Sequence, residues 1–386
     1  MVDSVRPFSP QVVTVFGGSG FLGRYVVQAL ARRNYRIRVA VRRPNLAGNV
    51  LPFGEVGQIL AVQANLRFPS SVQAAVQGTS AVINLVGILQ ESGRQTFDAV
   101  QADGARTVAE AAAAAGARIV HVSAIGADPA SKSAYARTKA AGEAVIRQAR
   151  SDAVIFRPSL IFGPGDSFFN RFALLARILP VLPLAGADTR FQPVYAADVS
   201  EAIGRAVDGQ VAGGQVYELG GPEIKTLREL VEYMLAVTER RRRVVSVPDQ
   251  AARIQALVME TLDMLTLGLL PNEFKLTRDQ IVLLGRDNVV SEEAVREGRT
   301  LQGLGITPTA LEAIVPSYLV RFRRTGQFDI GRDTAVASNT PDMIASTSMG
   351  PDSDFHPERG TGPAAGFEAG GSATAEPASA QRGTAS

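Results

Sequence analysis

Tyr135 and Lys139 stand four residues apart in the stretch SAYARTKAAGE. Residues at this spacing share one face of an α-helix, so the phenol and the ammonium would be neighbours. A nearby cation favours the phenolate and lowers the pKa of a phenol, which starts near ~10. The pair could therefore transfer a proton near neutral pH, and Lys139 could also bind the ribose hydroxyls of a dinucleotide. The chain contains only four lysines, so we do not interpret the pair as accidental.

Two serines are candidates for a third catalytic group. Ser123 ends the apolar run RIVHVS and could donate a hydrogen bond to a substrate carbonyl. Ser133, two residues before Tyr135, is a rival for that role. His121 lies in the same apolar run as Ser123, and we interpret it as a half-buried strand residue rather than a catalytic base.

The residue types that the chain lacks exclude several kinds of chemistry. The 386 residues include no cysteine and two histidines, so thiolate nucleophiles, disulfides and thiolate metal sites are excluded, and we expect no metal. The formal net charge is +3, which suits an anionic cofactor or a membrane or protein surface. No basic patch is interleaved with aromatic residues, so we expect no nucleic-acid partner.

A glycine-rich loop precedes a helical pattern near the N-terminus. The stretch VTVFGGSGFLGRYVVQALARR places Gly17, Gly20 and Gly23 between a strand-like run and an amphipathic run. Glycines at these points permit a tight turn and a close approach of the backbone to a pyrophosphate. The first helical residues, Phe21 and Leu22, would offer backbone N–H groups to the phosphates. We therefore predict that this loop binds a dinucleotide and is more than a turn.

The end of the second strand-like run indicates which dinucleotide is bound. NAD-binding versions of this unit carry an acidic residue there, which holds the ribose hydroxyls. In this chain the stretch YRIRVAVRRPN instead ends in Arg42 and Arg43. A guanidinium can pair with the 2′-phosphate of NADP, which a carboxylate would repel. We predict NADP(H), with NAD(H) less favoured and Arg42 as the main discriminating residue, although arginine is common throughout the chain.

Further cofactor contacts are expected where the other strands end. In an open α/β sheet the ligand lies beyond the carboxyl ends of the strands. Asn65 follows the third strand-like run, where it could contact adenine. Leu85 and Gly87 follow the fourth run, on the nicotinamide side, and Pro158 ends the sixth. The alternative for these residues is a structural role in a turn.

Short apolar runs and helix-period runs alternate over residues 12–160 and predict the fold. The strand candidates are VVTVF, RIRVAV, QILAVQ, AVINLV, RIVHVS and AVIFRP; the helix candidates are Phe21–Arg33, Ser70–Val76, Arg94–Ala115 and Ala134–Gln148. This rhythm predicts an α/β, Rossmann-type, doubly wound parallel sheet with helices on both faces. The strand candidates are continuously apolar, as in strands that are buried on both faces.

Composition and rhythm also suggest how the chain is divided. We predict an NAD(P)-binding Rossmann domain over residues 11–164, with returning elements near 190–222. Residues 165–189 and 223–330 are expected to form a smaller, mostly helical C-terminal substrate domain. Residues 331–386 are rich in Gly, Ala, Ser, Thr and Pro without periodicity, so we expect a disordered tail.

Two apolar stretches in the C-terminal part bear on membrane contact. SFFNRFALLARILPVLPLAG and AARIQALVMETLDMLTLGLL are amphipathic, and we interpret them as core-facing helices of the smaller domain. Both contain charged residues, so neither should span a bilayer. The run Arg240–Arg243 is interpreted as a solvated charge run; contact with an acidic lipid or partner is the alternative. With no targeting segment visible, we expect a cytoplasmic protein, with peripheral contact at the inner face of the cytoplasmic membrane left open.

In combination, VFGGSGFLG, HVSAIGA, YARTK, RPSLIFGPGD and PVYAADV resemble the extended and atypical short-chain dehydrogenase/reductase superfamily. The resemblance covers residues 11–240 and implies a Rossmann domain, a smaller substrate domain and a catalytic set of Ser123, Tyr135 and Lys139. The stretch between Ser123 and Tyr135 is short and lacks the family's tandem-serine pattern, which argues against nucleotide-sugar chemistry.

A narrower resemblance comes from VINLVGIL, SAYARTKAAGEAVIR, RPSLIFGPGDSFFNRF, LTRDQI and LGITPTALE. These stretches are similar to the NADPH-binding accessory subunit of mitochondrial respiratory complex I and its bacterial relatives. That resemblance implies an NADP(H)-binding protein, without assigned turnover, whose partners are complex I subunits or quinone-biosynthesis enzymes. The first alternative is an active NADP(H)-dependent reductase of a hydrophobic carbonyl or quinone-like substrate, with Tyr135 supplying the proton. A nucleotide-sugar epimerase is the lesser alternative.

Overall fold

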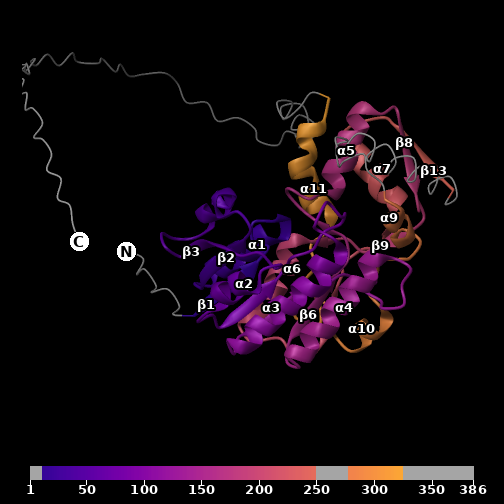
Figure 1. The fold of residues 1–386 in the computed structure, drawn as a ribbon. Helices are drawn as coiled ribbons and strands as arrows, with labels where there is room; N and C mark the ends of the chain where they lie inside the picture. Colours follow the sequence, from indigo (N-terminus) through magenta and orange to yellow (C-terminus); the bar gives the residue numbers. More distant parts are fainter. Residues whose placement is uncertain (1–10, 249–276, 325–386) are drawn as a thin grey trace, which may run out of the picture. The chain divides into compact units, whose positions relative to one another are not determined.

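The computed structural model describes residues 11–248 and 277–324. Its centre is a seven-stranded sheet in which all neighbouring strands are parallel (Figure 1). The spatial order is β11-β6-β5-β4-β1-β2-β3, so the direction of winding reverses between β1 and β4. The strands are β1 (Val12–Phe16), β2 (Arg36–Val41), β3 (Ile59–Gln63), β4 (Ala81–Asn84), β5 (Arg118–Val122), β6 (Val154–Pro158) and β11 (Val216–Leu219). In sheets of this kind, ligands bind at the carboxyl ends of the strands beside the reversal.

Helices cover both faces of the sheet, as the alternating sequence pattern predicts. On one face, α1 (Phe21–Arg32) and α6 (Ala196–Val207) pack with the strands into one buried apolar cluster. On the other face, α2 (Pro69–Val76), α3 (Asp103–Ala114) and α4 (Ala134–Ala149) form a second cluster. The doubly wound Rossmann fold is therefore confirmed.

The element bounds agree closely with the sequence prediction, with one instructive difference. The helix expected from Arg94 begins only at Asp98, as a π-helical turn that runs to Ala102 and leads into α3. Before it, Ser92 and Gln95 form an antiparallel bridge, which closes a turn that helical periodicity cannot reveal.

A third apolar cluster lies apart from the two that flank the sheet. It is formed mainly by α5 (Phe168–Ile178), α7 (Leu227–Val237), α11 (Leu311–Leu319) and the strand β8 (Val181–Ala185). Phe169, Ala173 and Ala176 of α5 are buried in it, so the first half of the first apolar stretch is a core-facing helix as expected. The second half is not helical and forms the strand β8 instead. The helices α5, α7 and α11 lie together above the sheet in Figure 1.

Short strands complete this part of the chain, and of these only the ones within residues 190–222 were expected, as returning elements. β8 pairs in parallel with β13 (Arg243–Val247). The two-residue strands β7 (Ile161–Phe162), β9 (Arg190–Phe191), β10 (Val194–Tyr195) and β12 (Lys225–Thr226) form the pairs β10–β7 and β12–β9. Three further short helices are α9 (Arg278–Leu283), α10 (Glu292–Arg296) and the 3₁₀ turn η5 (Val320–Phe322).

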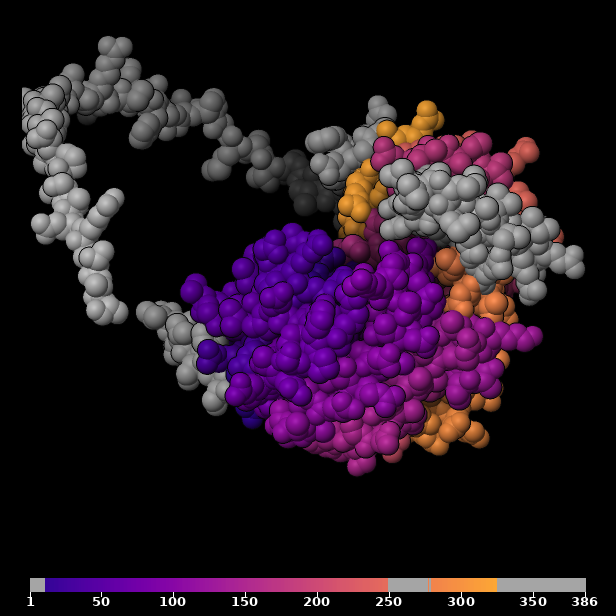
Figure 2. Space-filling view, viewed as in Figure 1, coloured from indigo at the N-terminus to yellow at the C-terminus, as the bar shows by residue number. Residues whose placement is uncertain are grey.

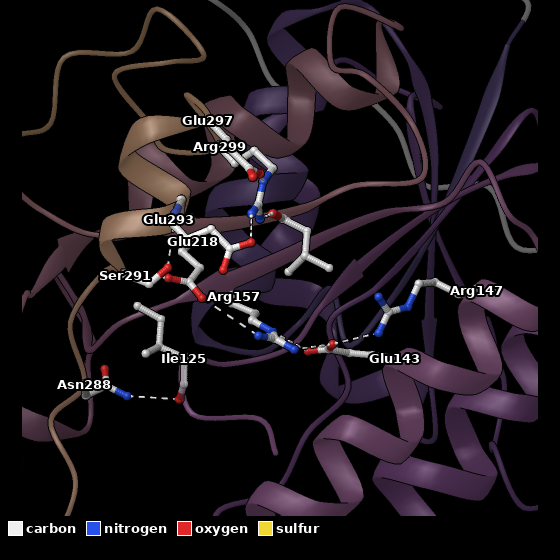
Figure 3. Close-up of polar contacts among 12 residues, drawn as sticks. Ile125, Glu143, Arg147, Arg157, Glu218, Asn288, Ser291, Glu293, Glu297 and Arg299 are labelled. Carbon is white, nitrogen blue, oxygen red and sulfur yellow. Dashed lines mark hydrogen bonds and ion pairs between the residues drawn. The ribbon is translucent and has the colours of Figure 1, made fainter. Parts of the chain in front are cut away.

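The segment that follows α9 packs against the Rossmann sheet and makes hydrogen bonds with it (Figure 3). The Asn288 amide donates to the carbonyl oxygen of Ile125 at 3.1 Å, and the Ser291 N–H donates to Glu218 of β11 at 2.7 Å. Arg299 donates to the carbonyl oxygen of Val216 at 2.6 Å. In Figure 2 the orange residues of this segment lie against the magenta surface of the central part of the chain. The C-terminal segment thus belongs to the edge of the sheet.

Three predictions stay outside the described structure or untested by it. The described residues belong to one compact unit, so the predicted division at 164/165 remains a prediction. The predicted disordered tail at 331–386 and the second apolar stretch lie outside the described residues. Within the described residues, no helix is both long and apolar enough to cross a bilayer.

Candidate functional site

The glycine loop between β1 and α1 has the close packing that a pyrophosphate site needs. Gly17 has φ +80°, a left-handed conformation that favours glycine. A Cβ on Gly23 would lie 2.3 Å from the carbonyl oxygen of Gly17, so any larger residue would push the loop away from the helix. Gly20 is the N-cap of α1 and supplies no side-chain cap. The N–H groups of the first turn, which begins with the half-buried Phe21 and Leu22, are therefore open to an anionic ligand.

The second strand ends beside this loop in two arginines. The N–H of Gly17 donates to the carbonyl oxygen of Ala40 in β2 at 3.4 Å, which ties the loop to that strand. Arg42 follows β2 directly and is exposed. Among the described residues, no carboxylate or hydrogen-bond partner of the Arg42 guanidinium is found. Arg42 therefore follows a strand that is hydrogen-bonded to the glycine loop, and its role in binding a phosphate stays a prediction.

Gly87 and Lys139, predicted from separate motifs, meet in the structure. A Cβ on Gly87, just beyond β4, would lie 3.1 Å from the Lys139 Nζ. The ammonium is buried and donates to the carbonyl oxygen of Val122, at the end of β5, at 3.2 Å. Burial lowers the pKa of Lys139 to about 8, although the nearby Glu143 opposes the shift. Lys139 therefore lies at the carboxyl ends of β4 and β5, where the sheet geometry predicts the ligand.

Tyr135 lies one helical turn before Lys139, but its environment is not the one predicted. The Lys139 Nζ is 6.0 Å from the centroid of the Tyr135 ring, and the ring makes an edge contact with Phe97. Burial first, and then the negative charge of Asp279, raise the pKa of Tyr135 to about 12. The expectation that Lys139 lowers this pKa is therefore wrong for the chain as it stands, because burial and the nearby carboxylate prevail.

The two candidate serines have different surroundings. Ser133 is the N-cap of α4: its hydroxyl accepts from the Ala136 N–H at 3.2 Å and donates to Asp279 at 2.8 Å. The Ser123 hydroxyl is buried and has no partner among the described residues. Ser123 is therefore the serine that retains a free donor for a substrate. Its role stays a prediction.

The sequence context of His121 predicted a half-buried strand residue, but the structure shows it fully buried. It is 2% exposed, and neither ring nitrogen has a partner within the described structure. Burial, with a smaller contribution from Lys139, lowers the pKa of His121 to about 3. A neutral core histidine is consistent with the interpretation that it is not a catalytic base.

Asp279 is the residue that sequence reasoning missed. Its carboxylate accepts hydrogen bonds from the N–H groups of Ala134 at 2.7 Å and Tyr135 at 3.3 Å, in addition to the Ser133 hydroxyl. A carboxylate at this position satisfies the free donors of α4 and interacts favourably with the helix dipole. Asp279 lies 145 residues after Ala134 in the sequence, so no local sequence pattern links the two. Only the LTRDQI stretch, which was noted for its family resemblance, contained it.

Three further residues were predicted to contact the cofactor: Asn65, Leu85 and Pro158. The Asn65 side-chain oxygen accepts from the N–H of Arg67 at 3.2 Å, which leaves its amide group as the part that could meet adenine. The carbonyl oxygen of Pro158 accepts from the N–H of Ile125 at 3.1 Å, so its backbone supports the loop after Ser123. Leu85 is half-buried and follows β4 directly.

A pocket of about 480 Å³ borders the site. Its lining combines apolar side chains with polar groups of α5, and it shares the loop after β4 and the helix α9 with the site. The lining residues are Leu89, Gln90, Asp166, Ser167, Asn170, Arg171, Leu174, Gln280 and Phe322. Among the described residues, no group of three or more acidic or histidine side chains could hold a metal ion.

Comparison with known proteins identifies the family of this chain. The model of the NAD dependent epimerase/dehydratase family matches residues 13–220 of the 386. The chain belongs to this family. The family resemblance inferred from the motifs is therefore confirmed, and so is the Rossmann-type fold of this NAD(P)-binding family.

Relatives of this family member include respiratory-chain proteins. The mitochondrial NADH dehydrogenase [ubiquinone] 1 alpha subcomplex subunit 9 of Arabidopsis thaliana is 33% identical over 320 residues, 82% of this chain and 79% of that protein. A ceramide reductase of Caulobacter vibrioides is 38% identical over 192 residues, 50% of this chain and 59% of that protein. The epimerase/dehydratase member described here thus has relatives named both as respiratory subunits and as a reductase.

Solved structures agree on the fold. The NADPH-dependent quinone oxidoreductase of Escherichia coli, in complex with NADPH, has a TM-score of 0.60 at 20% identity and covers 80% of this chain and 99% of that one. A dTDP-glucose 4,6-dehydratase of Streptomyces venezuelae with NAD bound has a TM-score of 0.59 at 19% identity, with 81% and 96% covered. This fold therefore occurs in solved structures with either dinucleotide.

Proposed function

We propose that this protein binds NADP(H) and acts as an accessory protein of respiratory complex I, with the dinucleotide as a structural or regulatory ligand. The observation that carries the proposal is the extent of the similarity to the subunit 9 protein of Arabidopsis thaliana. The 320 aligned residues exceed the 208 residues matched by the family model, so the similarity includes much of the chain outside the common dinucleotide-binding part. Quinone-biosynthesis enzymes remain the related class of partner.

The preference for NADP(H) rests on Arg42. The end of β2 carries this exposed guanidinium where NAD-binding relatives of the fold place a carboxylate. A guanidinium forms strong charge-assisted hydrogen bonds with phosphate. Titrating the purified protein with NADPH and NADH tests the assignment. We expect tighter binding of NADPH, and we expect Arg42→Asp to lose at least about tenfold in NADPH affinity, or about 1.4 kcal/mol, while NADH binding changes little. Tighter binding of NADH by the wild type would contradict it.

Two features of the site support a ligand role without turnover. The Lys139 ammonium donates to the Val122 carbonyl, and the Lys139 Nζ lies 6.0 Å from the centroid of the Tyr135 ring. The pKa of Tyr135 is raised to about 12, so its phenol is a weaker acid than that of an ordinary tyrosine, which disfavours proton donation to a substrate. Lys139 could bind the ribose hydroxyls of the dinucleotide in a protein of either kind.

Two experiments test the proposed function: an affinity pull-down and complementation of a deletion strain. An affinity pull-down of the full chain from solubilised membranes should recover complex I subunits, and it would support the related alternative if it recovered quinone-biosynthesis enzymes. In a deletion strain, Tyr135→Phe should complement fully, whereas Gly20→Val should not, because it blocks the pyrophosphate loop. Loss of complementation by Tyr135→Phe, with the variant folded and binding NADPH, would show that turnover is the function.

The second candidate is an NADP(H)-dependent reductase of a hydrophobic carbonyl. Its specific support is the ceramide reductase relative, together with the unpartnered Ser123 hydroxyl and the partly apolar pocket beside the site. In that reaction, the Ser123 hydroxyl would bind the carbonyl oxygen, Tyr135 would donate the proton, and Lys139 would orient the ribose. The nicotinamide, when bound, supplies the hydride. We further propose a cytoplasmic location, with peripheral attachment to the inner face of the cytoplasmic membrane for the complex I role alone.

A further inference from the structure

Four successive arginines line an open pocket far from the glycine loop in the sequence. The pocket measures about 830 Å³ and lies between the end of α7, the start of β13 and the turn before β8. Figure 1 shows α7, β8 and β13 together in this part of the molecule. The lining residues are Pro180, Val181, Glu232, Leu235, Arg240, Arg241, Arg242, Arg243 and Val244.

Backbone hydrogen bonds fix two of these guanidinium groups without neutralising them. After α7 ends, Glu239 adopts a φ of +54°, and the chain turns sharply. The Arg240 Nε then donates to the carbonyl oxygen of Phe322 at 2.8 Å, and the Arg242 Nε donates to that of Ala176 at 2.8 Å. A neutral carbonyl holds a guanidinium in place but leaves its charge uncompensated, so these two groups are pre-positioned cations.

The surrounding charges do not compensate the cluster. Burial, followed by the charges of Arg242, Arg177 and Arg324, lowers the pKa of Arg240. Two carboxylates are near, but each has another partner. Glu232 pairs with Arg228 at 3.6 Å, and Glu239 pairs with Arg323 at 3.2 Å.

Arg241 and Arg243 complete the cluster. Both side chains are exposed, and within residues 11–248 and 277–324 neither has a carboxylate or hydrogen-bond acceptor. Repulsion among unpaired cations is unfavourable by itself, and it is relieved when an anion binds among them.

We propose that the pocket lined by Arg240–Arg243 is a binding site for a phosphate group, separate from the dinucleotide site. Guanidinium groups recognise phosphate oxygens through two parallel N–H···O bonds, a geometry that lysine cannot reproduce. That phosphate could belong to a free metabolite or to a phospholipid headgroup, and both present the same chemistry.

The experiment uses the full chain with two probes at low ionic strength. The first probe is inorganic phosphate, followed by the shift of the thermal unfolding temperature. The second is sedimentation with vesicles of phosphatidylcholine alone or mixed with phosphatidylglycerol. The test variant is Arg241→Glu with Arg243→Glu. The matched control is Arg32→Glu with Arg36→Glu, because those exposed arginines near the start of β2 give the same change in net charge. NADPH binding reports that each variant is folded.

We expect a saturable phosphate response that weakens at least tenfold in the test variant and is unchanged in the control. Sedimentation with the phosphatidylglycerol vesicles, lost in the test variant, would assign the phosphate to a lipid headgroup. A phosphate response without sedimentation would assign it to a soluble ligand. An equal response of the wild type and the test variant, an equal loss in the control, or no response to either probe would overturn the proposal.

Discussion

At the scale of single residues, the charge of Lys139 depends on pH within the range near neutrality. Lys139 is buried beside Gly87, and its pKa of about 8 lies well below the ordinary value of 10.5. Between pH 8 and 10.5 the unfolded chain binds more protons at this lysine than the folded chain does. The contribution of Lys139 to stability is therefore unfavourable below pH 8 and becomes less unfavourable as the pH rises through that window.

This titration should be visible in cofactor binding. If the ammonium of Lys139 donates to the ribose, raising the pH from 7 to 9 should weaken NADPH binding by about tenfold, because about nine-tenths of the lysine is then neutral. Lys139→Met should bind more weakly at pH 7 and should lose this dependence. Fluorescence titration across the range provides the measurement, with the exposed Lys132→Met as the control. A pH dependence that persists in Lys139→Met would show that another group is responsible.

A second residue prediction concerns Asp279. Replacing it with alanine removes the acceptor for the Ser133 hydroxyl and the Ala134 N–H, so we expect a loss of about 1–2 kcal/mol of stability, as for other helix caps. The pKa of Tyr135 should fall, since a negative charge that raises it is lost. Urea unfolding measures the stability. Asp287→Ala is the control, because its exposed pair with Arg190 contributes less than about 1 kcal/mol. Equal effects of the two substitutions would contradict the capping role.

At the scale of elements, α4 is fixed to the sheet by a buried carboxylate. Glu143 of α4 accepts two hydrogen bonds from Arg157 of β6, at 2.8 and 2.7 Å, and the Glu143 side chain is 1% exposed (Figure 3). Arg147 approaches the same carboxylate at 3.6 Å from a half-exposed position. Arg157 also faces Glu218 of β11, so the pair connects a helix with two strands.

The two arginines provide a matched comparison. Arg157→Met leaves the buried Glu143 without its main partner, and we expect a loss of about 3–5 kcal/mol. Arg147→Met removes only a distant and exposed partner of the same carboxylate, and we expect a loss below about 1 kcal/mol. Urea midpoints at neutral pH measure both. Comparable losses from the two substitutions would show that the bidentate pair is not what stabilises α4.

The elements that could be predicted are those whose signal is local. The six strand candidates and the glycine loop could be predicted because apolar runs and glycine spacing are patterns within short stretches of the sequence. β8 was missed because Pro183 interrupts its pattern, and β13 because it opens in a run of arginines. The position of Asp279 and the raised pKa of Tyr135 could not be derived, because both depend on a contact between distant parts of the chain.

At the scale of the whole molecule, residues on both sides of the undescribed segment 249–276 complete the same Rossmann sheet. Arg286 pairs with Asp128 at 2.9 Å, and Asn288 donates to the carbonyl of Ile125, both in the loop that links β5 to α4. A chain ending at residue 324 retains these contacts, whereas a chain ending at residue 248 loses them all. We expect the longer chain to bind NADPH and to unfold within about 2 °C of the full protein.

The shorter chain should be insoluble or should unfold without cooperativity, because α4 and the edge strand β11 lose their partners together. Thermal unfolding and gel filtration of the two truncated chains provide the measurement. A residue 1–248 chain that binds NADPH normally would contradict the view that the C-terminal segment is part of this fold.

The contact between Asp279 and the start of α4 also constrains how the protein is made. A ribosome releases the glycine loop, α4 and β6 long before it reaches residue 279, so the nascent Rossmann part must wait with the first turn of α4 incompletely bonded. Contacts between residues so distant in sequence slow folding and prolong the exposure of apolar strands. During synthesis, the start of α4 thus obtains this acceptor only when a segment far outside the glycine-rich motif has been made.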